Sequence, residues 1–216
     1  MPTFPHGSLE LTDTNTFEAG SDFYATPLTI TSSFSLTVSF DLTIGGGSHT
    51  FGTPADGATV DLLDDRVGLP VVGPDGGGLG WAGLNGVGVA FKTFDDGTRG
   101  TNCGDPGSNF VSIINGARCK AGSPCSGTCV KYVLSYFSGS TLPSLIGRTN
   151  RVSVNFTGSS GTSGVITVWV NGHVYLTESD VAFPAHAYLG FTAGTGGDTS
   201  AHIISNFTIG TGHDLR

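Results

Sequence analysis

A glycine-rich segment, residues 73–80 with the sequence GPDGGGLG, is well suited to present its backbone to a ligand. Because glycine lacks a side chain, the N–H groups of such a segment can approach a bound molecule closely. A phosphate-binding loop would require a following Gly-Lys-Ser/Thr, and a dinucleotide-binding fold would require a following helix. The sequence shows neither, so the segment is either a plain surface loop or a loop that contacts a ligand through backbone donors.

The four cysteines form a second group of chemically distinctive residues. An even number of cysteines in a weakly charged chain favours two disulfides in an exported protein. All three pairings remain open. A zinc site would need cysteines or histidines in tight pairs, and spacings of 16, 6 and 4 residues do not supply them. The four residues are Cys103, Cys119, Cys125 and Cys129.

Catalytic groups are not evident in the sequence. A glycoside hydrolase needs two carboxylates about 5 to 9.5 Å apart, but the chain has no E-x-D-x-x-E pattern on a strand. Asp61, Asp64 and Asp65 lie close together, and we interpret them as a solvated, charged loop. A nucleophile elbow, G-x-S-x-G, is missing. We therefore expect no catalytic residues and no enzymatic activity.

Short β-type runs separated by Gly, Pro, Asn and Asp must position any functional site. The run at 28–44 alternates apolar and polar residues from Phe34 onward, which is typical of a half-buried antiparallel strand. Asn171-Gly172 lies between two β-type runs and predicts a hairpin. Helical periodicity is not evident. Further strands are expected at 87–94, 110–114, 132–137, 151–156, 165–170, 187–191 and 203–209.

Composition excludes several classes of protein. The 216 residues carry a net charge of −8, which disfavours binding to nucleic acid. Strong helix formers are few, which argues against a helical bundle, and no apolar run of about 20 residues could span a membrane. We expect one domain over residues 1–216, all-β, folded as an antiparallel β-sandwich or jelly roll.

Five segments stand out along the chain: SFSLTVSFDLTI at 33–44, ADG at 55–57, GGGLG at 76–80, VGVAFKTFDD at 87–96 and GFTAGTGGDTSAHIISNFTI at 190–209. Their order resembles that of the L-type lectins, the family of legume lectins and of animal cargo lectins of the secretory pathway. The resemblance covers most of the chain and implies a concanavalin A-like sandwich that binds carbohydrate without catalysis.

The resemblance also implies a set of sugar contacts. Asp56 would accept hydrogen bonds from two sugar hydroxyls, Gly77 would donate its backbone N–H, and Phe94 would pack on the apolar face of the ring. Gly197 and Asp198 occupy two positions that set specificity in the family. A charged acceptor, a backbone donor and an aromatic plane match the hydroxyls and the apolar face of a sugar.

The family's metal site is altered in this sequence. The carboxylates and histidine that hold calcium and a transition metal in the family are replaced by Ala90, Lys92 and Phe110. Lys92 places an ammonium where a calcium-binding carboxylate is expected. Asp96, at the position of an Asn that contacts both sugar and calcium, and Asp105 are the remaining candidates for metal ligands. We expect no metal, with calcium as the open alternative.

Lys92 could take over part of the role of the ion. We expect its ammonium to pair with Asp105, and with Asp56 or Asp96, and so to hold the loop. In the family, calcium helps to hold a cis peptide at the position of Ala55–Asp56. The alternative is that Lys92 faces solvent on its strand and that the sugar site has decayed.

The sequence thus predicts a non-catalytic, calcium-independent carbohydrate-binding protein. Its partners would be glycans or glycoproteins, with no nucleic acid and no membrane span, and it could form homo-oligomers. We expect export to the extracellular space, although the N-terminus lacks a signal-peptide pattern. The alternative is a structural, adhesion or self-assembling extracellular module on the same sandwich that no longer binds sugar.

Overall fold

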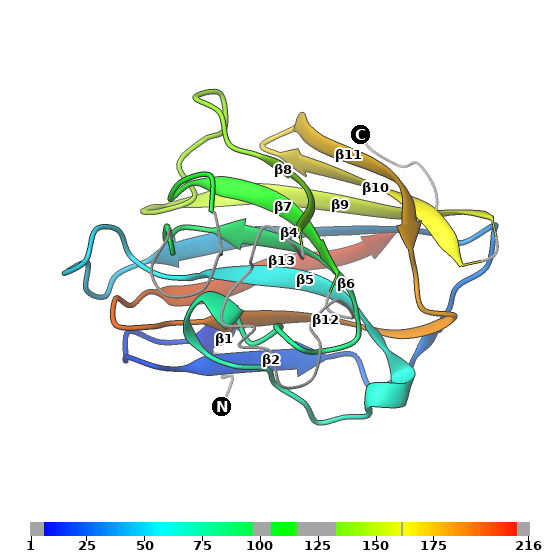
Figure 1. The fold of residues 1–216 in the computed structure, drawn as a ribbon, viewed down its shortest axis with the longest axis horizontal. Coiled ribbons are helices and arrows are strands. Elements are labelled where there is room, and N and C mark those ends of the chain that lie inside the picture. The colour runs from blue at the N-terminus through cyan, green and yellow to red at the C-terminus, as the bar shows by residue number, and fades with distance from the viewer. Residues whose placement is uncertain (1–6, 97–104, 116–132, 161, 211–216) are drawn as a thin grey trace.

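Two antiparallel β-sheets packed face to face make up the structure (Figure 1). It is a computed structural model that describes residues 7–96, 105–115, 133–160 and 162–210. The predicted all-β sandwich is confirmed. Helix within these ranges is confined to two 3-10 turns, η2 (Asp65–Val67) and η3 (Gly76–Gly78). No helix in these ranges is long and apolar enough to cross a membrane.

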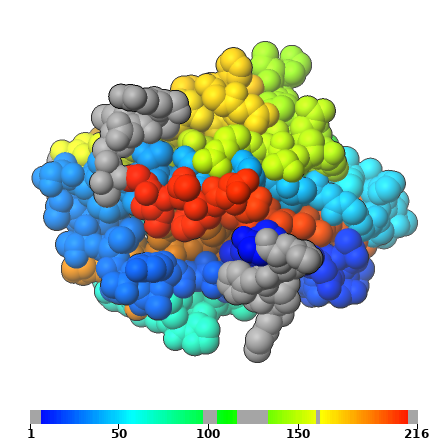
Figure 2. Space-filling view, turned by 180° about the vertical axis from the view of Figure 1, so that it is seen from behind, coloured from blue at the N-terminus to red at the C-terminus, as the bar shows by residue number. Residues whose placement is uncertain are grey.

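The first sheet has six strands in the order β1-β13-β4-β9-β10-β11. Figure 2 shows the outer face of this sheet, with β13 (red) across the middle of the molecule. The predicted hairpin at Asn171-Gly172 is confirmed, since it joins β10 to β11 with both residues at positive φ. The strands are β1 (Leu9–Thr12), β13 (Ala201–Gly210), β4 (Ser35–Gly45), β9 (Arg148–Ser160), β10 (Ser163–Val170) and β11 (His173–Ala182).

The second sheet has seven strands. Its main path is β2-β12-β5-β6-β7-β8, and a short strand, β3, also pairs with β12. β12 is therefore central, with β5 on one side and β2 and β3 on the other. The strands are β2 (Ala19–Phe23), β12 (His186–Gly194), β5 (Gly57–Asp64), β6 (Gly86–Lys92), β7 (Phe110–Asn115), β8 (Val133–Phe137) and β3 (Leu28–Thr29).

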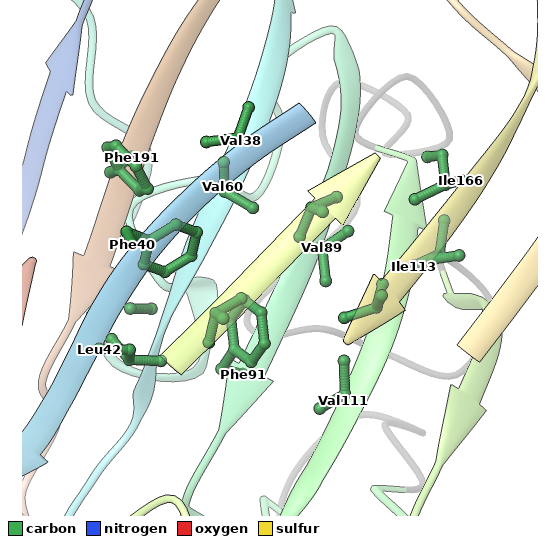
Figure 3. Packing of buried hydrophobic residues seen from close by; sticks show 14 of the residues in the cluster. Val38, Phe40, Leu42, Val60, Val89, Phe91, Val111, Ile113, Ile166 and Phe191 are labelled. Atoms are coloured by element: carbon green, nitrogen blue, oxygen red, sulfur yellow. The ribbon is translucent and has the colours of Figure 1, made fainter. Parts of the chain in front are cut away.

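The main hydrophobic core fills the space between the sheets (Figure 3). Alternate residues of β4 point inward, as the period-two pattern of its sequence predicted. Phe40 of this strand makes edge-to-face contacts with Phe91 and Phe191, at ring-centroid distances of 6.2 and 5.0 Å. These contacts join β4 of one sheet to β6 and β12 of the other.

A smaller apolar cluster covers the outer face of the second sheet. Leu79 and Trp81, from the segment after β5, pack there against Leu63, Ala90 and Ile114. Both faces of β5 and β6 are therefore buried, so these strands show no exposed alternation. This covering segment includes the glycine-rich residues and brings them to the edge of the sheet.

Three sequence predictions are corrected by the fold. Asp61 and Asp64 do not lie in a solvated loop, because β5 places both in buried positions. The predicted strand at 28–44 is interrupted, with β3 ending at Thr29 and β4 beginning at Ser35. Strands β1, β2 and β5 were not predicted. The four cysteines lie outside the described residues, so the disulfides stay a prediction.

The Phe40 contacts give a test of the core. Phe40→Ala should lower the free energy of unfolding by about 3–5 kcal/mol, because the ring is buried between both sheets and its removal leaves a cavity. Urea denaturation would measure the change. Val174→Ala, at a position 55% exposed, is the control and should shift stability by no more than about 0.5 kcal/mol. Equal effects of the two variants would contradict this packing.

Candidate functional site

Loops from four parts of the chain meet at one end of the sandwich, at the left in Figure 1, and form a pocket of about 210 Å³. The volume is below the roughly 300–1,000 Å³ of pockets for drug-sized ligands. All six residues predicted from the sequence line this pocket, so the fold brings together groups separated by up to 142 positions. They are Asp56, Gly77, Phe94, Asp96, Gly197 and Asp198.

Asp56 is anchored through its backbone at the start of β5. Its N–H donates to the carbonyl of Gly194 at 2.9 Å, and its own carbonyl accepts from the N–H of Thr93 at 2.9 Å. The peptide bond between Ala55 and Asp56 is cis, as the resemblance implied. The Asp56 side chain is 2% exposed, and its Oδ2 has no hydrogen-bond partner among the described residues. A buried carboxyl oxygen without a partner thus belongs to a residue that lines the pocket.

The glycine-rich loop fits against the acidic side of the pocket. A Cβ added at Gly77 would lie 2.1 Å from Oδ2 of Asp96, so only glycine can occupy this position without a displacement. The neighbouring Gly76 donates its N–H to the carbonyl of Thr195 at 2.9 Å. This bond ties the glycine-rich loop to the β12–β13 loop, which carries Gly197 and Asp198.

Asp198 and Phe51 form the opposite wall. Asp198 is 1% exposed, and its Oδ2 accepts from the Phe51 N–H at 2.8 Å while its Oδ1 has no hydrogen-bond partner among the described residues. The Phe51 ring is 58% exposed and lies beside Gly197, where an added Cβ would be 3.2 Å from the ring. Sequence reasoning missed Phe51. Its loop, between β4 and β5, has no periodic pattern, and a lone aromatic residue was the only signal.

Lys92, the last residue of β6, is completely buried beside this pocket. Its Nζ lies 2.5 Å from an oxygen of Asp96 and 2.5 Å from an oxygen of Asp105, and 6.0 Å from the ring centroid of Phe110. The same Asp105 oxygen accepts the backbone N–H of Asp96 at 3.1 Å. The expected pairing with Asp105 and Asp96 is therefore present, and the alternative of a solvent-facing lysine is wrong.

Burial and charge shift the pKa values of this cluster. Burial by itself lowers the pKa of Lys92, but attraction by Asp96 and Asp105 outweighs it, so the net pKa is raised and the lysine is charged. Burial raises the pKa of Asp56 from 3.8 to about 8, and repulsion by Asp96 adds to this rise while Lys92 opposes it. Asp56 thus holds its proton more strongly than an exposed carboxyl does.

A larger hollow of about 420 Å³ lies elsewhere, along β1, β2, β12 and β13. Its lining is mostly apolar and includes Phe23, Tyr24 and Phe207. Among the buried side-chain atoms of the described residues that lack a hydrogen-bond partner, none lines this hollow, whereas Asp56 and Asp198 contribute two to the smaller pocket. The smaller pocket is therefore the better candidate for a polar ligand.

Comparisons with known proteins agree with this architecture. No protein-family model and no curated protein matches the sequence. The exoplasmic/lumenal domain of VIP36, in a Ca2+- and mannose-bound form, matches with a TM-score of 0.71 and 14% identity over 100% of this chain and 82% of that chain. Basic winged bean lectin with Tn-antigen matches with a TM-score of 0.69 and 20% identity over 97% and 90%.

A third structure, lectin I-B4 from Griffonia simplicifolia in a metal-free form, matches with a TM-score of 0.71 and 17% identity over 98% of this chain and 90% of that chain. The chain has the fold of the L-type lectins. Matches at such low identity establish a shared fold and nothing more. The function must therefore be argued from the site itself. On this lectin fold, Lys92 and the six pocket residues are the features that decide what the site can do.

The Lys92 cluster should be a main contributor to stability. Lys92→Met should lower the free energy of unfolding by about 3–5 kcal/mol, because it leaves the carboxylates of Asp96 and Asp105 without their cation. Adding Asp105→Asn to this variant should restore part of the loss. Arg151→Met, which breaks an exposed pair with Asp41, should change stability by about 0–1 kcal/mol. Urea denaturation of the four proteins would measure these effects.

Asp56 should make stability depend on pH. Because its pKa is about 8 in the folded chain and near 3.8 when exposed, the folded state binds more protons between these values. Stability from this group is therefore full at low pH and declines as pH rises toward 8. Asp56→Asn removes this decline, so its stability relative to the native chain should increase from pH 5 to pH 9.

Thermal unfolding at pH 5, 7 and 9 would measure this difference. Asp180→Asn, on the exposed side of β11, is the control and should leave the pH dependence unchanged. Parallel pH profiles for the native chain and Asp56→Asn would show that the Asp56 carboxyl is not the source.

Proposed function

We propose that the chain is a non-catalytic carbohydrate-binding protein and that it binds sugar without calcium. The observation that supports this most is the convergence of six predicted contact residues on one pocket, with two buried carboxylate oxygens lacking partners. Sugar hydroxyls can donate to such oxygens. The structures with a similar fold include a mannose-bound form of VIP36 and a winged bean lectin with Tn-antigen, which supports the same class of ligand.

Each wall of the pocket would meet a different part of a sugar. Asp56 would accept from hydroxyls, and the backbone of Gly77 would donate to one. Phe94, half-buried at the rim, offers a ring for the apolar face of the pyranose. Gly197 and Asp198 on the opposite loop would select among sugars. Affinity for one sugar ring should be weak, because each hydroxyl must leave water to bind.

Calcium independence is supported by the position of Lys92. A calcium ion requires about six to eight oxygen ligands, several of them carboxylates. Oxygens of Asp96 and Asp105 are already bound to the Lys92 ammonium, which would repel a divalent cation. Within the described residues, no group of three or more His, Cys, Asp or Glu side chains is arranged to hold a metal. The described residues around Lys92 therefore favour a site without the family's calcium ion.

The fold also bears on where the protein would act. The VIP36 structure with a similar fold is of an exoplasmic/lumenal domain. Glycans are displayed mainly on the outside of cells and in secretory compartments. These observations support our proposal that the protein is exported and that its partners are glycans or glycoproteins.

A glycan array probed with the purified chain, in calcium and then in excess chelator, tests the proposal. We expect binding that survives the chelator, because Lys92 cannot be removed by it. Asp56→Ala should abolish binding, and Gly77→Ala should weaken it strongly, since the added Cβ would displace Asp96. Asp75→Ala, on an exposed position of the same loop but outside the pocket lining, is the control and should bind normally.

Two outcomes would contradict the proposal in different ways. Binding that disappears in chelator would show that the loops hold calcium despite Lys92. Absence of binding in both buffers would favour the structural or adhesion role on the same sandwich.

A further inference from the structure

The pocket is acidic, and no Lys or Arg of the described residues is free to balance its negative charge. Asp56, Asp96 and Asp198 all line it. Lys92 is fully buried and forms ion pairs with Asp96 and Asp105. Its positive charge is therefore already balanced by these two carboxylates. Among the described residues, no Lys, Arg or His lines the pocket. A ligand therefore meets an acidic surface with a deficit of positive charge.

Two carboxyl oxygens of this surface lack a hydrogen-bond donor among the described residues. Asp56 Oδ2 and Asp198 Oδ1 belong to side chains 2% and 1% exposed, and neither has a hydrogen-bond partner among the described residues. A hydroxyl would supply a donor to either oxygen but would bring no positive charge into this acidic surface. A protonated amine supplies donors and charge together, and hydrogen bonds of this kind are roughly twice as strong as neutral ones.

Two phenyl rings complete the surroundings of such a ligand. Phe51 is 58% exposed at the rim, beside Gly197, and Phe94 lines the same pocket. The faces of aromatic rings attract cations and also pack on apolar ring faces of sugars. Phe51 adds an aromatic surface to the wall formed with Asp198, and it is not among the six contacts that the family resemblance implied.

We propose that the preferred ligand is a sugar carrying a free, protonated primary amine, an unacetylated hexosamine, and that sugars carrying a carboxylate are excluded. This inference rests on the proposed carbohydrate-binding function and specifies its substrate class. The amine would lie between the unpartnered oxygens of Asp56 and Asp198, with the ring against the phenyl groups. An acidic sugar would instead bring a carboxylate toward the acidic side chains of Asp56, Asp96 and Asp198, which would repel it.

Calorimetric titration with matched methyl glycosides tests the proposal. Four forms of each ring are compared: the free amine, the N-acetylated amine, the neutral hydroxyl and the uronic acid, in the gluco, galacto and manno series. The pH is kept low enough for the amine to carry its proton. In the series that binds, the free amine should bind about tenfold more tightly than the N-acetyl and hydroxyl forms. The uronic acid should bind more weakly than either.

Asp198→Asn provides a variant of nearly the same shape. Its amide oxygen can still accept from the Phe51 N–H, so the loop contact is kept while the charge is removed. The preference for the amine over the neutral sugar should fall to about twofold or less. Asp75→Asn removes the same charge from an exposed position outside the lining, and it should retain the full preference.

The outcomes separate this inference from the function on which it rests. A neutral sugar that binds as tightly as the amine would overturn the inference and leave carbohydrate binding intact. Ethylamine, which lacks a sugar ring, should compete weakly, and equal competition would show that the pocket recognises an amine alone. If none of the glycosides binds, the proposed function fails as well.

Discussion

The ion-pair cluster of Lys92 is the interaction on which the ligand-facing end of the sandwich depends. It joins the last residue of β6 to Asp96, which lies against Gly77, and to Asp105, which precedes β7. Three neighbouring segments are thus connected through one buried ammonium. Because the cluster is shielded from water, its attraction is much stronger than that of an exposed pair. The rigid sheets supply the positions, and this cluster fixes the loops between them.

The pocket combines good packing with groups that are poorly satisfied. Asp56 and Asp198 are almost inaccessible to solvent, yet each has a carboxylate oxygen without a partner. Buried polar groups without hydrogen bonds destabilise a fold, and the raised pKa of Asp56 has the same origin. Asp56 is held by the bond from its N–H to the Gly194 carbonyl and by the bond from the Thr93 N–H to its own carbonyl. Asp198 is held by the bond from the Phe51 N–H to its carboxylate. Such an arrangement is stable as a whole and locally unfavourable at the point where a ligand would bind.

Much of this structure could be predicted from the sequence, and the exceptions have physical reasons. The period-two pattern of β4 and the Asn-Gly turn before β11 identified a half-buried sheet. β5 was missed because both of its faces are covered, so no exposed alternation marks it, and its aspartates suggested a solvated loop. The six pocket residues were found through the order of family motifs. Phe51 was not, since it lies in an irregular loop whose geometry is set by a tertiary bond to Asp198.

The positive charge at this end of the sandwich is part of the chain and cannot dissociate, which has a consequence for how the loops fold. The occupancy of a dissociable ion follows its concentration in the medium, so loops held by such an ion are ordered only where the ion is abundant. The ammonium of Lys92 is delivered by the chain itself in one-to-one stoichiometry when β6 pairs with β5 and β7. The loops at this end therefore acquire their cation in the same cooperative step that forms the sheet, independently of the composition of the surrounding fluid.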